Sequence, residues 1–204
     1  MSQGLMPERA FTAPGKDWRR AACLIVLLLG LQAAGATVHS MLKLDAGAVW
    51  DKGEWWRLIT AHFVHLSWPH ALLNAAGVAV CCALAPAVFD RRLGWRLAWL
   101  AAGTSMCLAV FSPGLLPYVG LSGVLYGLFA QGLLPAALQR DRQAMLALAC
   151  LAAWLAWQSL ASPLEAEEAL IGGRIAHAAH LYGVALAIVG CIGAALWRRW
   201  LPRA

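Results

Sequence analysis

The chain has 204 residues, a formal net charge of +6 and a composition that is 61% hydrophobic and 13% charged. Soluble domains are closer to one half apolar and one quarter charged, so this composition excludes an ordinary soluble domain. The excess apolar residues lie in long runs, which indicates a protein embedded in a lipid bilayer. No stretch combines a basic face with interleaved aromatic residues, so the positive charge does not indicate nucleic-acid binding.

A helix needs about 20 mainly apolar residues to cross the hydrocarbon of a bilayer. We predict an all-α membrane protein with a short cytoplasmic segment, residues 1–17, and one six-helix bundle domain, residues 18–204. Basic residues precede the first apolar stretch, as in a signal peptide, but the stretch is too long for one and we expect it to be retained. The predicted transmembrane helices are Ala21–Met41, Pro69–Phe89, Leu93–Phe111, Gly120–Leu138, Ala144–Ala161 and Ile175–Trp197.

The basic residues are distributed unevenly among the segments that connect these helices. Twelve of the 16 Lys and Arg residues precede the first helix, follow the sixth, or lie in the turns after the second and fourth helices. Cytoplasmic segments carry the excess of Lys and Arg, so both termini are predicted to be cytoplasmic. The long segment after the first helix then lies on the outer side, where its tryptophans suit the membrane interface: Trp50, Trp55, Trp56 and Trp68.

The cysteines give no sign of a metal site or of a disulfide framework. All six lie within the predicted helices, and their spacing is not that of metal ligands. We therefore expect small, buried apolar side chains at Cys23, Cys81, Cys82, Cys107, Cys150 and Cys191. Neither a metal nor a cofactor is predicted.

Two polar residues lie inside the second predicted helix, where a polar group is costly without a function or a partner. His70 and Asn74 are four residues apart, so their side chains share one face of the helix. Asn74 lies about one turn below the outer end, which is too deep for an interfacial residue. The pair is either functional or makes a hydrogen bond between helices.

The fourth predicted helix begins with a serine between glycines, in the run Gly120-Leu121-Ser122-Gly123. Glycine on either side allows other backbone or a substrate to approach the serine closely. A serine at the start of a helix also keeps its own N–H outside the helical hydrogen bonds, where the N–H can bind an oxyanion. The alternative is helix packing through small residues, which the motif taken alone favours.

The sixth predicted helix carries His180, with Gly183 three residues later on the same face. Small residues on this face allow a neighbouring helix to pack at close range. If that neighbour is the fourth helix, with Gly123 and Gly127, His180 can reach Ser122.

The predicted topology brings these polar residues to one level, about one turn below the outer surface. Ser122 is then a nucleophile activated by His180 as general base. The N–H of Ser122 and the side chains of His70 and Asn74 would bind the oxyanion. The acidic residues of the outer side are all in loops, so we expect a dyad, with the ring of Tyr126 stacked on the histidine.

These residues resemble those that mark the rhomboid intramembrane serine proteases, over about Glu54–Ala187. The resemblance implies cleavage of membrane-anchored protein substrates within or beside their transmembrane segments, in a multi-pass protein of the bacterial inner membrane. It also implies that no metal or cofactor takes part and that Gly120 supports the oxyanion site. Four motifs carry the resemblance: Trp56-Arg57, the run from His65 to Asn74, Gly120-Leu121-Ser122-Gly123 with Tyr126, and Ala179-His180-Leu181-Tyr182-Gly183.

The chain also resembles the rhombosortase branch of that family, in the runs from Trp56 to His65 and from Val119 to Gly127. This resemblance implies substrates with a C-terminal tail made of Gly-Gly, a hydrophobic helix and basic residues. One alternative is a catalytically inactive rhomboid-like binder of membrane proteins, although inactive relatives usually lack the serine or the histidine. The other is a metal or solute transporter that uses His62, His65, His70, His177 and His180, but deep acidic residues are missing.

Overall fold

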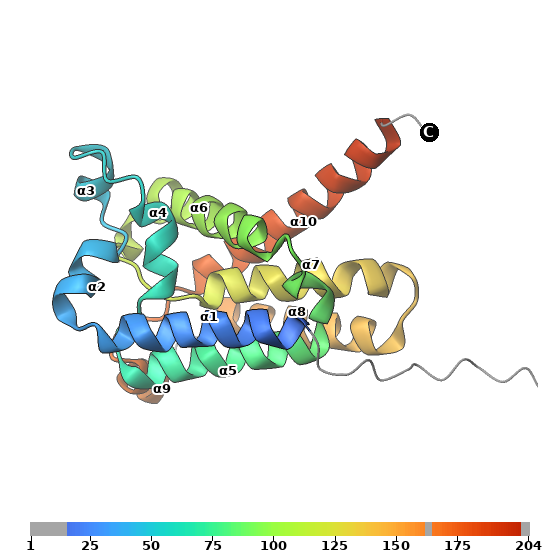
Figure 1. Ribbon diagram of the computed structural model, residues 1–204, viewed down its shortest axis with the longest axis horizontal. Helices are drawn as coiled ribbons and strands as arrows, with labels where there is room; N and C mark the ends of the chain where they lie inside the picture. The colour runs from blue at the N-terminus through green and yellow to red at the C-terminus, as the bar shows by residue number, and fades with distance from the viewer. Residues whose placement is uncertain (1–15, 162–164, 201–204) are drawn as a thin grey trace, which may run out of the picture.

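The computed structural model describes residues 16–161 and 165–200, and Figure 1 shows a bundle of helices that run back and forth between two ends. Apart from one isolated β-bridge between Leu44 and Tyr118, the regular structure in these residues is helical. The α-helices are α1 (Lys16–Ala33), α2 (Ala36–Leu42), α3 (Ala46–Trp50), α4 (Arg57–Thr60), α5 (Trp68–Leu84), α6 (Leu93–Phe111), α7 (Ser122–Leu138), α8 (Arg142–Leu160), α9 (Glu165–Ile171) and α10 (His177–Trp200). Short 3₁₀ turns are η1 (Ala61–Phe63), η2 (Pro86–Phe89) and η3 (Pro113–Leu115).

The prediction of an all-helical membrane protein is confirmed, with three to five candidate spans in the described residues. Three helices there are long and apolar enough to cross a bilayer: Leu93–Phe111, Arg142–Leu160 and His177–Trp197. Two further spans result if each of two bent helix pairs counts as one. The remaining predicted span, α7, is a shorter apolar helix of 17 residues. The count of six spans stays a prediction.

The first predicted helix, Ala21–Met41, is wrong as a continuous element. The helix ends at Ala33, and α2 leaves it at an angle of 115°. The break lies at Gly35, whose φ of 85° is outside the helical region and is readily adopted only by glycine. Residues 1–15 of the predicted N-terminal segment lie outside the described residues, and α1 already begins at Lys16.

The boundaries of two other predicted helices also need correction. The second predicted helix does not reach Phe89, because α5 ends at Leu84 and a 3₁₀ turn begins at Pro86. Proline disfavours the helical conformation of the residue before it, which explains the end of α5. The fourth predicted helix begins at Ser122 rather than Gly120, since Gly120 has a φ of 119°. Leu93–Phe111 agrees with α6 at both ends.

Helix α7 lies in the middle of the bundle, in contact with α5, α6, α8 and α10 (Figure 1). Its closest neighbour is α10, and glycines make the close approach possible. A Cβ added at Gly123 would lie 2.7 Å from the carbonyl oxygen of Ala179, and one at Gly127 would lie 2.8 Å from that of Gly183. The fourth predicted helix therefore packs against the sixth, which is the condition under which His180 can reach Ser122.

The segment between α2 and α5 is held in place by Arg57. This buried side chain donates to the carbonyl oxygens of Ser40 and Lys43, both at 2.9 Å, and forms an ion pair with Glu54. The same segment contributes Leu44 to the bridge with Tyr118, just before α7. The segment is thus tied to the loop that leads into Ser122.

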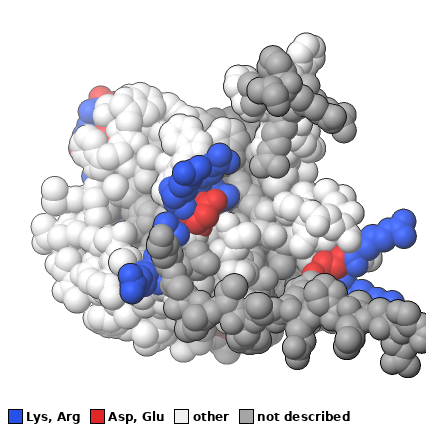
Figure 2. Space-filling model, turned by 45° about the vertical axis from the view of Figure 1, so that its right-hand side comes forward, with Lys and Arg blue, Asp and Glu red and all other residues white. Residues whose placement is uncertain are grey.

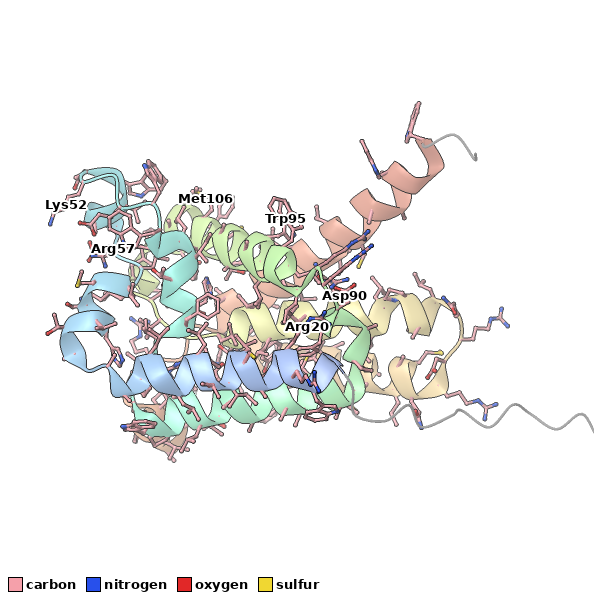
Figure 3. The ribbon with its side chains drawn as sticks, viewed as in Figure 1. Arg20, Lys52, Arg57, Asp90, Trp95 and Met106 are labelled. Atoms are coloured by element: carbon pink, nitrogen blue, oxygen red, sulfur yellow. The ribbon has the colours of Figure 1, made fainter. Side chains whose placement is uncertain are left out.

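Charged residues lie at the two ends of the bundle. In Figure 3, Arg20 and Asp90 lie at one end, whereas Lys52 and Arg57 lie at the other. Figure 2 turns the former end toward the viewer and shows that the charged side chains of the described residues on this face lie in separate patches. The beginning of α1 and the end of α10 lie toward this end (Figure 1). Which end faces the cytoplasm stays a prediction.

Candidate active site

Ser122 is the first residue of α7 and follows a sharp change of backbone direction at Gly120. Because the helix begins at Ser122, its N–H precedes the helical hydrogen-bond ladder. Gly120 has a left-handed φ of 119°, and a Cβ there would lie 2.9 Å from the ring of His70. Glycine at 120 thus permits both the turn and the approach of His70.

The structure brings Ser122 and His180 together, from the first turns of α7 and α10. The Oγ of Ser122 lies 2.9 Å from Nε2 of His180. This distance depends on the contact between Gly123 and Ala179, which sets α7 and α10 close together one residue away from each side chain. His180 is buried, whereas Ser122 is partly exposed.

The ring of Tyr126 lies flat on the ring of His180, as the sequence predicts. The two centroids are 4.2 Å apart and the planes differ by 4°. The tyrosine is held in turn by α8, since the indole Nε1–H of Trp154 donates to its hydroxyl oxygen at 2.7 Å. The imidazole therefore has little freedom to rotate out of its plane.

Gln158, on α8, occupies the other side of the histidine, and sequence reasoning did not find it. Its Oε1 lies 2.9 Å from Nδ1 of His180. An amide oxygen only accepts hydrogen bonds, so Nδ1 carries the proton and Nε2 is free to accept from Ser122. The backbone oxygen of Gln158 also accepts from Nδ1 of His177 at 2.9 Å. A signal was available, because a polar side chain in a predicted span is a functional candidate.

His70 faces the same site from the first turn of α5. Its Nδ1 accepts from the N–H of Leu66 at 3.4 Å, which leaves the proton of the neutral ring on Nε2. Nε2 lies on the side of Gly120, and the ring lines the same cavity as Ser122 and His180. The ring of His65 packs against it edge to face, with centroids 4.9 Å apart.

Asn74 lies one turn deeper than His70 and does not line that cavity. Its side-chain Nδ2 donates to the carbonyl oxygen of His70 at 3.0 Å, within the same helix. The side chain is buried and its Oδ1 has no hydrogen-bond partner among the described residues. Asn74 thus touches the backbone of His70 rather than the ring of His180.

The carbonyl oxygen of Gly120 contacts two polar side chains, and the sequence did not indicate either contact. The hydroxyl of Tyr118 donates to it at 2.8 Å, and Nδ1 of His62 lies 3.2 Å from it. The other ring nitrogen of His62 lies 3.0 Å from the oxygen of Ala101 on α6 and 2.9 Å from Oγ of Ser105. These contacts hold the turn before Ser122 between α6 and the segment after α2.

A cavity of about 250 Å³ opens beside the serine and the histidine. Apart from Ser122 and His180, it is lined by residues 114–119, by Ile171 and residues 173–176, and by Leu66 and His70. The walls are mainly apolar, and Arg174 is the charged residue among those that line it. The cavity is smaller than the usual range of about 300–1,000 Å³ for small-molecule sites.

The histidines do not form a cluster suited to a transported metal. Within residues 16–161 and 165–200, no three His, Cys, Asp or Glu side chains are arranged to hold a metal ion. His62 and His65 lie in and after η1, and His177 contacts a backbone oxygen of α8. The arrangement gives no support to the transporter interpretation.

Comparison with known proteins identifies the family of the chain. A search of curated proteins found no match to the chain. A family model described as the Rhomboid domain matches residues 52–199, a range that includes the serine, both histidines of the cavity and all the helices from α4 to α9. Since this match covers most of an all-helical membrane chain, the protein belongs to the rhomboid family of intramembrane proteases.

Proposed function

We propose that this chain is an active intramembrane serine endopeptidase with Ser122 as nucleophile and His180 as general base. The observation that carries the proposal is the distance of 2.9 Å between Oγ of Ser122 and Nε2 of His180. A serine hydroxyl is a weak nucleophile until a base accepts its proton, and this distance permits that transfer. Family membership alone leaves open an inactive binder, which would not need a paired serine and histidine.

The reaction follows from the donors and acceptors around the serine. Oγ of Ser122 attacks the carbonyl carbon of the peptide bond while its proton passes to Nε2 of His180. The oxygen of the tetrahedral intermediate becomes negatively charged and accepts hydrogen bonds from the N–H of Ser122 and from Nε2–H of His70. Asn74 supports this donor set indirectly, through the hydrogen bond from its Nδ2 to the carbonyl oxygen of His70.

Collapse of the intermediate completes the first half of the reaction. The protonated His180 gives its proton to the leaving amine, the C–N bond breaks, and the acyl group stays on Ser122 as an ester. A water molecule then loses a proton to the same imidazole and attacks the ester, which releases the acid and restores the serine. Tyr126 keeps the imidazole in one plane through both halves by stacking on it.

The proposed setting is the bacterial inner membrane, with six spans and both termini in the cytoplasm. The charge distribution supports this topology, since 12 of the 16 basic residues fall on the side predicted to be cytoplasmic. Residues 18–204 then form a single protease domain, and the cavity opens at the outer ends of α5, α7 and α10. Water and substrate would reach the serine from that side.

We further propose that the substrates are exported proteins with a rhombosortase-type tail, in which Gly-Gly precedes a short hydrophobic helix and basic residues. The motifs around Trp56 and Ser122 support this branch. The small cavity supports it too, because it suits small side chains next to the cleaved bond. Glycine also favours local unwinding of a helix, which exposes the carbonyl to attack.

Labelling of the purified protein with a fluorophosphonate tests the catalytic proposal without knowledge of the substrate. The wild-type protein should be labelled, and both Ser122→Ala and His180→Ala should lose the label while keeping their helical content. Ser40→Ala is the matched control, because that hydroxyl donates to the oxygen of Thr37 far from the cavity. Absence of label on folded wild-type protein would favour the inactive, binding relative.

A further inference from the structure

Helix α8 makes one polar contact with His180 and another with Tyr126, the residue stacked on His180, and both come from one face of α8. Trp154 and Gln158 are four residues apart on α8 and therefore point the same way. Gln158 lies 2.9 Å from Nδ1 of His180, and Trp154 donates to the hydroxyl of Tyr126 at 2.7 Å. Tyr126 in turn stacks on His180. Helix α8 thus holds the imidazole of His180 directly, at Nδ1, and indirectly, through the stacked ring of Tyr126.

We propose that Gln158 is a positioning residue that sets the tautomer and the orientation of His180, and this inference rests on the proposed function. Proton transfer from Ser122 requires an unprotonated Nε2, so the single proton of the neutral ring must be on Nδ1. The amide oxygen of Gln158 accepts from Nδ1–H and therefore favours the competent tautomer. In soluble serine proteases a buried aspartate holds the histidine in this way.

A neutral amide suits this position better than a carboxylate. The surroundings are membrane helices, where a buried carboxylate is costly unless a positive charge accompanies it. An amide oxygen supplies the acceptor without that charge. The amide does less than an aspartate to stabilise the imidazolium that forms during the reaction, so its contribution is orientation rather than charge.

The packing of α8 makes these contacts the main links between the site and that helix. Ala144 and Leu155 are the buried residues of α8, and the rest of its apolar side chains are partly or fully exposed. Trp154 itself is 45% exposed, so burial of its ring does not explain its position. The indole is held instead by its hydrogen bond to Tyr126.

Three variants separate positioning from folding, with fluorophosphonate labelling as the readout. Gln158→Leu removes the acceptor, and the maximal labelling rate should fall about tenfold while the half-saturating concentration stays unchanged. Gln158→Glu keeps the acceptor but adds a negative charge, so labelling should persist and its acidic limb should move to higher pH. Gln143→Leu, at the exposed beginning of the same helix, should label like the wild-type protein.

The comparison between Gln and Glu at 158 leaves the other titratable groups of the site unchanged. These are His177, whose ring centroid is 6.0 Å from that of His180, Tyr126 stacked on the same ring, and His70 and Arg174 in the lining of the cavity. A shift of the pH profile in Gln158→Glu would therefore come from the new carboxylate beside His180. A structural role of Gln158 alone would change the melting temperature but not this profile.

The possible outcomes distinguish this inference from the proposed function. Wild-type labelling together with an unchanged rate in Gln158→Leu would overturn the positioning role and leave the protease intact. If Gln158→Leu fails to fold, Gln158→Glu decides, because a pH profile identical to that of the wild type would overturn the role as well. Lack of label on the wild-type protein would remove both proposals together.

Discussion

Gly123 at the start of α7 lies against the backbone of Ala179 on α10, so closely that an added Cβ would be 2.7 Å from its carbonyl oxygen. Backbone atoms cannot move aside as a flexible side chain can, so the two helices must separate to admit a methyl group. Because Ser122 and His180 are the neighbours of these two residues, separation of the helices would lengthen the distance between Oγ and Nε2.

Gly123→Ala should therefore cost about 1–3 kcal/mol of stability and should also slow fluorophosphonate labelling. Thermal unfolding in detergent and the labelling rate measure the two effects. Gly193→Ala is the control, since an added Cβ on that residue of α10 meets no atom within 4 Å. It should be neutral or should stabilise by about 0.5–1 kcal/mol. Equal behaviour of the two variants would contradict the close contact of α7 and α10.

His70→Ala should lower the rate of substrate cleavage by about 10²–10³, because it removes one oxyanion donor from the cavity. Asn74→Ala should leave measurable activity with a smaller loss, since its Nδ2 hydrogen bond goes to the backbone of His70. Rates of cleavage at saturating substrate check this order. A fully active His70→Ala variant would exclude His70 from the oxyanion site.

Asp90 should stabilise the protein in a pH-dependent manner. The guanidinium of Arg96, which donates to both carboxylate oxygens at 2.5 and 3.3 Å, holds the pKa of Asp90 below its usual range. A lowered pKa means that the stabilisation is present above the unfolded value, about 3.9, and is lost as the pH falls through the folded value. Asp90 lies in the turn between η2 and α6, and so between two predicted spans rather than within one.

Asp90→Asn should thus lower stability at neutral pH by about 0.2–1 kcal/mol, the range for exposed ion pairs. The difference from the wild-type protein should disappear at acidic pH, where the wild-type carboxyl is also neutral. Melting temperatures between pH 3 and pH 7 measure this difference. Asp51→Asn, an exposed residue after α3, serves as the control. A difference that stays constant over this pH range would exclude the ion pair as its cause.

A reporter with a C-terminal tail of Gly-Gly, a short hydrophobic helix and basic residues should be cleaved near the glycines when it is produced together with the enzyme. Glycine is the poorest helix former apart from proline, so the backbone there is most readily exposed to Ser122. Mass spectrometry of the new C-terminus locates the bond. Production with Ser122→Ala controls for other proteases. Unchanged cleavage after replacement of both glycines by leucine would favour a general rhomboid protease.

The sequence by itself determined the class of the protein, and it singled out Ser122 and His180 as the candidate catalytic residues. Spans and motifs are local features of the sequence. A run of apolar residues indicates a segment embedded in lipid, and a serine between glycines can be recognised without knowing which side chains lie near it in space. For the same reason α6 was predicted at both ends, from Leu93 to Phe111. The break at Gly35 was missed because glycine is also tolerated inside membrane helices.

Only the tertiary structure decided which side chains meet. The contacts of His180 with Gln158, and of Gly120 with His62 and Tyr118, join segments that are distant in sequence. Such contacts depend on how each helix is rotated and how deep it lies relative to its neighbours, and periodicity within one helix does not specify either. Asn74 is an example. The sequence placed it on the same helical face as His70, but it did not show that Asn74 lies too deep to line the cavity.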